Sequence, residues 1–206
     1  MTTRQSQPVT PSAGEDRPST WDAAIALIGH DFATGEEHAA DEVVDKTSVE
    51  RFCEPWEIGN PLYWDAKVAK QAGYRNQVVP WSALKQTFAY KGFWRPGDPT
   101  RFPIPSDKDV SARLGSFTPA SRPVPTPRTT TGIVTDIEIE FFEPVCVGDR
   151  ISIKGNKLVN VRPRKTRIGD GAFSNRESAF YNQRGELVAR ANSGGFSYIP
   201  NRPGQS

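Results

Sequence analysis

The amino-acid sequence predicts an α+β fold in which helices gather on one face of an antiparallel sheet. Between residues 20 and 92, apolar residues recur mostly at helical spacing. From Thr129 onward, apolar and polar residues alternate instead, and turn residues separate the strand patterns. Because helical patterns come first and a run of strands follows, the chain fits helices packed on one sheet rather than alternating strand–helix units.

The helical part of the chain carries recognisable start and stop signals. Thr20 suits the start of a first helix, and Thr47 or Ser48 suits the start of a second, which Pro55 ends. Gly73 follows a third helical pattern, and glycine is common just after a helix. The expected helices are 20–32, a short one through 49–53, 65–72 and 81–92, and the expected strands are 41–46 and 74–79.

A proline-rich stretch separates the two halves of the domain. Residues 93–128 contain eight prolines, and a segment of this length without regular structure is unusual inside a compact domain. We therefore expect 93–128 to be an insertion, either a lid or a flexible excursion. The strands expected after it are 132–142, 151–161, 172–181 and 186–198, with a turn at Gly148-Asp149, a basic stretch at 162–167 and a hairpin connection at 182–185.

Composition excludes several classes of function. The chain has 206 residues and a net charge of +2, which is too small to indicate a nucleic-acid-binding protein. No apolar run reaches the roughly 18 residues that span a membrane. Residues 1–19 are polar, so we expect a disordered tail, a single domain over 20–206 and a cytoplasmic protein. Cys53 and Cys146 are then reduced, and no ligand spacing predicts a metal site.

Two segments and a closing hairpin carry a resemblance to a known family. The first segment is Gly59-Asn60-Pro61-Leu62-Tyr63, and the second is 140–149, in which an aromatic strand ends at a proline and restarts after Val-Gly-Asp. Together with 182–189, they resemble MaoC-like enoyl-CoA hydratases and dehydratases, most of all the fatty-acid-synthase-like dehydratase subgroup. The resemblance covers roughly residues 40–200 and implies a hot-dog fold, in which an antiparallel sheet wraps a central helix and two such domains associate edge to edge.

The resemblance also implies the chemistry. Members of the family add water to an enoyl thioester, or remove it, with an Asp and a His that share the proton transfers. The Asp position falls on Ile58 and the His position on Tyr63, and neither side chain is a general base at neutral pH. Glu57 stands one residue away, as either a displaced catalytic carboxylate or a surface residue. The catalytic candidates are therefore Tyr63, Glu57 and Asn60.

Further residues are candidates for binding an acyl-CoA substrate. Asn60 either fixes a turn before its proline or faces the ligand. Tyr63 is a second candidate for facing the ligand. Trp81 and Ser82 lie where the family places a helix start against the thioester. A basic run either holds phosphates of CoA or is a solvated strand end; it comprises Arg162, Arg164, Lys165 and Arg167. An aromatic cluster either lines an acyl pocket or fills the core; it comprises Trp56, Trp64, Trp81, Phe93 and Trp94.

Neither His30 nor His38 supplies the missing pair, since both precede the first family segment. Two hypotheses therefore remain. In the first, the chain is the non-catalytic, pocket-forming subunit of a heteromeric hydro-lyase that acts on a bulky acyl-CoA, such as a fatty-acyl or steroid side-chain thioester, and a second MaoC-like subunit carries the Asp and His. In the second, it is a homodimeric acyl-thioester-binding protein, or a hot-dog enzyme with altered chemistry. No cofactor is expected beyond the acyl-CoA substrate itself.

Overall fold

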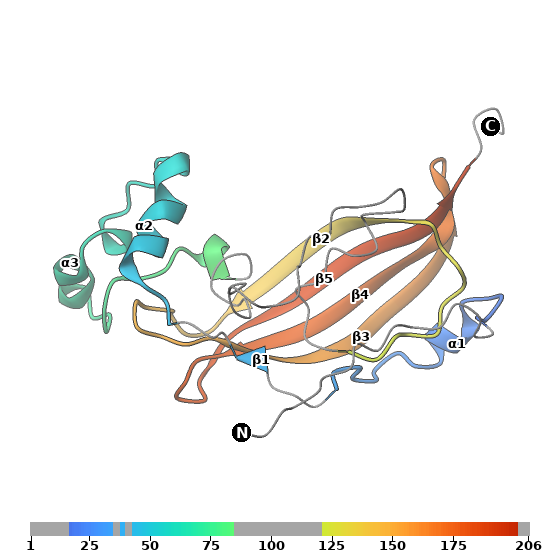
Figure 1. Ribbon diagram of the computed structural model, residues 1–206, viewed down its shortest axis with the longest axis horizontal. Coiled ribbons are helices and arrows are strands. Elements are labelled where there is room, and N and C mark those ends of the chain that lie inside the picture. Colours follow the sequence, from blue (N-terminus) through green and yellow to red (C-terminus); the bar gives the residue numbers. More distant parts are fainter. Residues whose placement is uncertain (1–16, 35–37, 40–42, 85–120, 202–206) are drawn as a thin grey trace, which may run out of the picture.

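The computed structural model describes residues 17–34, 38–39, 43–84 and 121–201. A five-stranded antiparallel sheet in the order β1-β3-β4-β5-β2 dominates them (Figure 1). Four of its strands are long, and β1 is a short edge strand. The strands are β1 (His38–Ala39), β2 (Thr131–Phe141), β3 (Ser152–Lys165), β4 (Gly169–Tyr181) and β5 (Leu187–Pro200).

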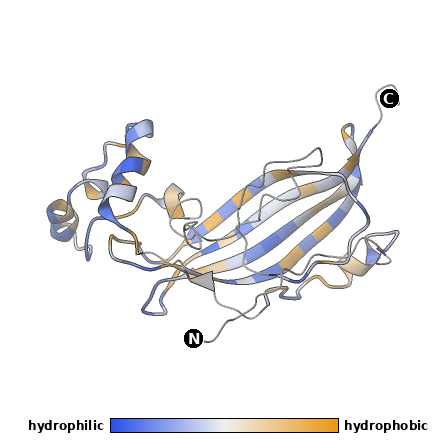
Figure 2. Ribbon diagram, in the orientation of Figure 1, coloured by the Kyte–Doolittle hydropathy of each residue, from blue (hydrophilic) through white to orange (hydrophobic). Residues whose placement is uncertain are grey.

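The four long strands confirm the alternating patterns of the sequence. Hydropathy alternates along them in Figure 2, as side chains on successive positions point to opposite faces. Strand β3 continues beyond its expected end at residue 161, because β4 stays paired with it from Lys165↔Asp170 back to Ser152↔Tyr181. Arg162, Arg164 and Lys165, expected to follow the strand, therefore lie within it, and Arg167 lies in the turn Thr166–Ile168.

The helices lie in two places rather than in one layer over the sheet. Helices α2 and α3 and the 3-10 turns next to them extend beyond one end of the sheet, which we call the helical end (residues 43–84) (Figure 1). Helix α1 lies along β3, toward the far end of the sheet, where Thr166–Ile168 joins β3 to β4. The helices are α1 (Asp22–Ile25), α2 (Lys46–Cys53), α3 (Ala66–Gln71), η1 (Glu54–Trp56), η2 (Pro61–Tyr63) and η3 (Trp81–Ala83).

Several predicted boundaries are wrong, each for a tertiary reason. The helix predicted at 20–32 ends at Ile25, because the chain turns and Gly29 N donates to Leu158 O on β3 (2.7 Å). The strand predicted at 41–46 is replaced, in its described part, by the start of α2: Asp45 is the N-cap, in place of Thr47 or Ser48. The carboxylate of Asp45 accepts from Ser48 N (3.0 Å).

Two more predicted elements are shorter than expected. The strand predicted at 74–79 makes a single bridge, between Val78 and Cys146. The helix predicted at 81–92 begins as the 3-10 turn η3, and residues 85–92, which hold the rest of the expected central helix, lie outside the described residues. The predicted tail and most of the predicted insertion lie outside them too; residues 121–128 contain no helix and only an isolated bridge, Ala33↔Ser121.

Two separate hydrophobic clusters hold these parts together. The first joins the helical end to the sheet, with Val49 and Leu84 packed near Ile153 and Phe180. The second lies under α1, where Ala24 meets Leu158 and other sheet residues. The core is therefore divided along the length of the sheet. No helix in the described part of the chain is long and apolar enough to cross a membrane.

Candidate functional site

The Asn60–Tyr63 segment forms a tight turn at the helical end. The side-chain oxygen of Asn60 accepts a hydrogen bond from Leu62 N (3.1 Å), which caps the 3-10 turn η2. Leu62 O in turn accepts from Val78 N (3.0 Å), so the turn is tied to the segment that leads to Trp81. Asn60 thus has the structural role that its position before a proline suggests.

Ile58 and Tyr63, the positions that the family resemblance predicts for the acid and the base, are both half-buried. Both side chains pack against the first hydrophobic cluster, and Tyr63 also touches the smaller cluster around Ala69. The phenol of Tyr63 forms no hydrogen bond with the described part of the chain, whereas its carbonyl accepts from the buried Gln77 amide (2.6 Å). These two positions therefore contribute apolar surface.

Glu57 is the nearest alternative carboxylate. Its backbone has φ of 50°, in the left-handed region, and it ends the 3-10 turn η1. The residue is exposed, and none of the described residues forms an ion pair with it. Glu57 is therefore a solvated carboxylate at a turn. Its position gives no structural support for a catalytic role.

Trp81 links the helical end to the edge of the sheet. Its ring meets the Phe141 ring edge-on, with the ring centres 4.5 Å apart, and 45% of Trp81 remains exposed. Ser82 follows it in η3 and is also exposed. Val79 and Ala83, on either side, belong to the same cluster that Tyr63 touches. The structure thus brings Asn60, Tyr63, Trp81 and Ser82 to one end of the sheet.

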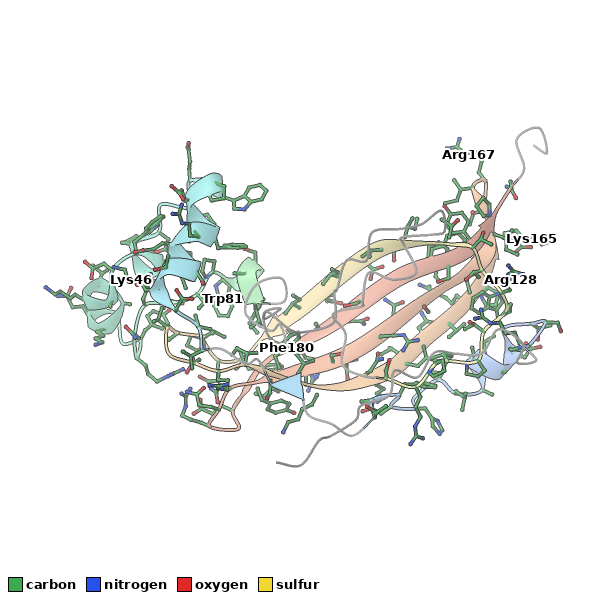
Figure 3. The ribbon with its side chains drawn as sticks, viewed as in Figure 1. Lys46, Trp81, Arg128, Lys165, Arg167 and Phe180 are labelled. Carbon is green, nitrogen blue, oxygen red and sulfur yellow. The ribbon has the colours of Figure 1, made fainter. Side chains whose placement is uncertain are left out.

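The basic run does not join these residues within the chain. Arg162, Arg164 and Lys165 are exposed on β3, and Figure 3 shows Lys165 and Arg167 at the far end of the sheet, away from Trp81. Lys165 has Asp170 at 3.9 Å. The basic run and Trp81 therefore lie at opposite ends of the sheet, and the role of the basic run in holding CoA stays a prediction.

Most of the aromatic cluster is not core. Trp56 is 72% exposed, and Trp64 and Trp81 also remain partly open to solvent, so the core interpretation fails for these three. The indole nitrogen of Trp64 donates to Ile58 O (2.6 Å), which leaves its ring at the surface. Phe93 and Trp94 lie outside the described residues. Exposed aromatic rings around Tyr63 fit a surface that a ligand or a partner covers.

The backbone contacts of the two histidines lie outside this group. His30 O accepts from Leu158 N (2.9 Å), which places His30 by α1. The backbone of His38 pairs with Ile153 in β1. Cys53 and Cys146 are free and buried, and burial raises the pKa of both thiols.

A buried carboxylate that the sequence motif did not identify as functional organises this end. Asp149, 1% exposed, accepts two hydrogen bonds from Arg75 (both 2.9 Å) and others from Cys146 N (2.9 Å), Gln183 (3.1 Å) and Arg184 (3.1 Å). Burial by itself raises the pKa of Asp149, but these donors outweigh it and hold that pKa below its ordinary value. Asp149 thereby joins the segment after α3 to the β4–β5 hairpin.

The edge strand β2 leaves apolar side chains uncovered. Ile133 is 45% exposed, Val134 73% and Ile137 48%, and β2 pairs only with β5 on its inner side. An edge of this length with apolar side chains is a template for pairing with another chain. The edge ends at Phe141, beside Trp81, so the candidate site and the open edge are continuous.

Comparison with known proteins agrees with this architecture. Residues 26–191 match the family model described as "FAS1-like, dehydratase domain region". A "probable enoyl-CoA hydratase alpha subunit" of Thermomonospora curvata is 25% identical over 158 residues, which cover 75% of this chain. The same match covers 45% of that relative, so the chain spans about half its length.

Solved structures share the fold at low sequence identity. A chain of the ChsH1–ChsH2 complex of Mycobacterium tuberculosis superimposes with a TM-score of 0.58 at 18% identity, covering 89% of this chain and 93% of that one. A MaoC-like dehydratase of Rhodospirillum rubrum superimposes with a TM-score of 0.50 at 18% identity, covering 85% and 94%. The α+β hot-dog fold is therefore confirmed, and the chain belongs to the family of FAS1-like dehydratase domain regions, among the MaoC-like hot-dog proteins.

Proposed function

We propose that this chain is the pocket-forming, non-catalytic subunit of an enoyl-CoA hydratase or 3-hydroxyacyl-CoA dehydratase. The observation that carries the proposal is the chemistry of Ile58 and Tyr63, which pack as apolar groups where the family carries its acid and its base. Hydration needs one group to deprotonate water and one to protonate carbon. A second MaoC-like subunit would supply that pair.

Two other carboxylates near the segment, Asp45 and Asp65, already cap helices. Asp45 caps α2, and the hydrogen bond from the Ser48 side chain is the main cause that lowers the pKa of Asp45. Asp65 caps α3 by accepting from Lys67 N (2.7 Å). Recruiting either one for catalysis would uncap a helix, at a cost of about 1 kcal/mol. This supports a partner, rather than a neighbouring residue of this chain, as the source of the acid and base.

The open edge supports the partner part of the proposal. An apolar β2 strand that runs to Trp81 offers backbone pairing and apolar contact at the same time. The relative from Thermomonospora is called an alpha subunit, and the similar mycobacterial chain was solved in a complex. We infer that β2 of this chain meets the corresponding edge of its partner.

The substrate we propose is an acyl-CoA with a bulky acyl group. Ile58 and Tyr63 give this half of the pocket an apolar wall, and Trp81 adds an exposed ring beside it. An apolar wall suits a fatty-acyl or polycyclic side-chain thioester, since pockets for such ligands are lined mostly by apolar and aromatic side chains. Asn60 and Ser82 lie at the rim of this surface, and no cofactor is proposed.

The test compares the chain alone with the chain plus a partner. We expect no hydration of crotonyl-CoA or trans-2-decenoyl-CoA by the purified chain. After co-expression with an Asp–His-bearing hot-dog subunit encoded beside it, we expect hydration. The loss of enoyl-thioester absorbance measures this reaction. Replacing the His of that subunit by Ala should abolish the activity of the complex.

Two outcomes contradict the proposal. Strong hydration by the purified chain would show that it carries its own catalytic groups. Calorimetry that shows a homodimer binding decenoyl-CoA, without association with any Asp–His-bearing subunit, would favour the second hypothesis, an acyl-thioester-binding protein.

A further inference from the structure

A cavity of about 150 Å³ lies at the far end of the sheet, away from the helical end. The sheet forms its floor, and α1 and the segment 122–129 lie over it. In Figure 1 that segment, drawn in yellow-green, passes α1 and runs round the end of the sheet to β2. Trp21, Leu158 and Val161 supply apolar walls. This cavity shares no residue with the group around Tyr63.

The floor of the cavity is polar because of the strand register. Ser174 and Arg176 are two residues apart on β4, so both side chains point to the same face of the sheet. Leu158 pairs with Arg176 and Val161 pairs with Ser174 on the neighbouring strand β3. The guanidinium group thus lies among apolar side chains and hydroxyl groups.

Arg176 has no counter-ion among the described residues. Within residues 17–34, 38–39, 43–84 and 121–201, no carboxylate pairs with it and no acceptor takes a hydrogen bond from it. Its guanidinium group lies over the Phe32 ring, whose centre is 5.9 Å from the guanidinium carbon. Burial lowers the pKa of Arg176, since no neighbouring negative charge offsets the loss of water. A partly buried cation is ordinarily paired, as Arg75 and Arg184 are with Asp149.

The hydroxyl groups around Arg176 are also free. Four of them line the cavity, and in the described ranges none has a hydrogen-bond partner within the protein; they belong to Thr126, Thr129, Ser174 and Ser197. Hydroxyl donors and a guanidinium fork that converge on one cavity match the needs of an oxyanion. Positive charge also gathers at this end, where Figure 3 shows Arg128, Lys165 and Arg167, and such a charge attracts anions.

We propose that this cavity binds the carboxylate of a small organic acid. The guanidinium of Arg176 would hold the two carboxylate oxygens, the hydroxyl groups would donate to them, and the hydrocarbon part would lie against Trp21, Leu158 and Val161. A cavity of about this volume accommodates about six carbon atoms, as benzene does in an engineered cavity of similar size. The apolar walls favour such an acid over inorganic phosphate. The site is independent of the proposed hydratase function.

The binding test uses the full chain, calorimetry, and benzoate and isovalerate as probes, with inorganic phosphate for comparison. We expect saturable binding of one carboxylate per chain. Arg176→Met should weaken it at least about tenfold, the loss expected when a charged hydrogen-bonding group is removed. Arg162→Met is the matched control, since Arg162 is exposed on the neighbouring strand, and it should bind as the unchanged chain does. No saturable binding, equal affinity in Arg176→Met, or tighter binding of phosphate would overturn the proposal.

Thermal unfolding of the chain without ligand tests independently whether Arg176 lacks a partner. Without ligand, Arg176→Met should not lower the melting temperature, because the substitution removes a desolvated charge that has no partner. A clear decrease would mean that contacts within the chain already hold Arg176, and the proposal would fail. If Arg176→Met does not fold, the double variant Ser174→Ala and Ser197→Ala replaces it. This double variant should weaken benzoate binding several-fold, and unchanged binding would contradict the site.

Discussion

At the scale of single residues, Tyr63, which the family resemblance aligns with the catalytic His, contributes its ring to packing. Its ring packs on two clusters, while its phenol makes no hydrogen bond within the described residues. Ile58 also packs through its side chain, and its backbone carbonyl accepts a hydrogen bond from the indole nitrogen of Trp64. These positions shape the surface around Asn60 through apolar contacts.

This leads to a prediction for Tyr63. In the active complex, Tyr63→Phe should leave kcat unchanged, because only the unused hydroxyl is removed. Tyr63→Ala should lower the free energy of unfolding by about 2–4 kcal/mol, since the ring is lost from two clusters. Steady-state kinetics and urea unfolding measure the two effects. A large fall in kcat for Tyr63→Phe at unchanged stability would make the phenol a catalytic group.

At the scale of elements, the pairing of β4 with β5 depends on a close approach of the two strands. A side chain at Gly171 would collide with the backbone oxygen of Ser197 and with Tyr198. By contrast, Gly59 has open space around it and no left-handed backbone. Of these two glycines, only Gly171 is required by packing.

We expect Gly171→Ala to lower the free energy of unfolding by about 2 kcal/mol, since overpacking a strand pair forces the backbone to shift. The matched control Gly59→Ala should change it by less than about 0.5 kcal/mol. Urea unfolding followed by circular dichroism measures both. Equal effects in the two variants would contradict the close approach of β4 to β5.

The Asp149 network joins three elements and predicts a pH dependence. The pKa of Asp149 is lower in the folded chain than its usual value near 3.9, so the folded state binds its proton less readily than the unfolded state does. The stabilisation is therefore fully present above about pH 4–5 and is lost as pH falls through the lowered pKa.

Asp149→Asn should lower the free energy of unfolding at pH 7 by about 2 kcal/mol, because hydrogen bonds from Arg75 to a charged group are lost. The difference from the unchanged chain should shrink as pH falls below about 4. Asp170→Asn is the control, since its pair with Lys165 is exposed, and exposed pairs contribute about 0–1 kcal/mol. A difference that stays constant with pH would contradict the ionised state of Asp149.

At the scale of the whole molecule, the edge strand β2 is the surface where we expect a partner subunit to bind. Among the described residues, β2 pairs with β5 alone, and Ile133, Val134 and Ile137 on it are exposed. We predict that Ile137→Lys abolishes association with a partner subunit, because a charge on this strand blocks edge-to-edge pairing. Sedimentation or size-exclusion chromatography of the co-expressed chains measures it.

The control is Ile168→Lys, at the β3–β4 turn, where the side chain is 46% exposed against 48% for Ile137. That variant should assemble normally. Association that survives Ile137→Lys, or that both substitutions abolish equally, would place the partner elsewhere.

The sequence by itself determined the strand part of the fold and the family. Alternation is a local property, so the four long strands, the helices around Val49 and Ala69, and the turn at Asn60 follow from neighbouring residues. The absence of the Asp–His pair at Ile58 and Tyr63 is equally visible in the printed chain.

Only the tertiary structure decided what depends on residues distant in sequence. The end of α1 at Ile25 is set by a contact with β3, and the length of β3 is set by its pairing with β4. The separation of Trp81 from Lys165 follows from the length of the sheet (Figure 3). Arg176 is the clearest case, because a charge becomes unusual only once the fold has removed its water, and no carboxylate of the described residues pairs with it.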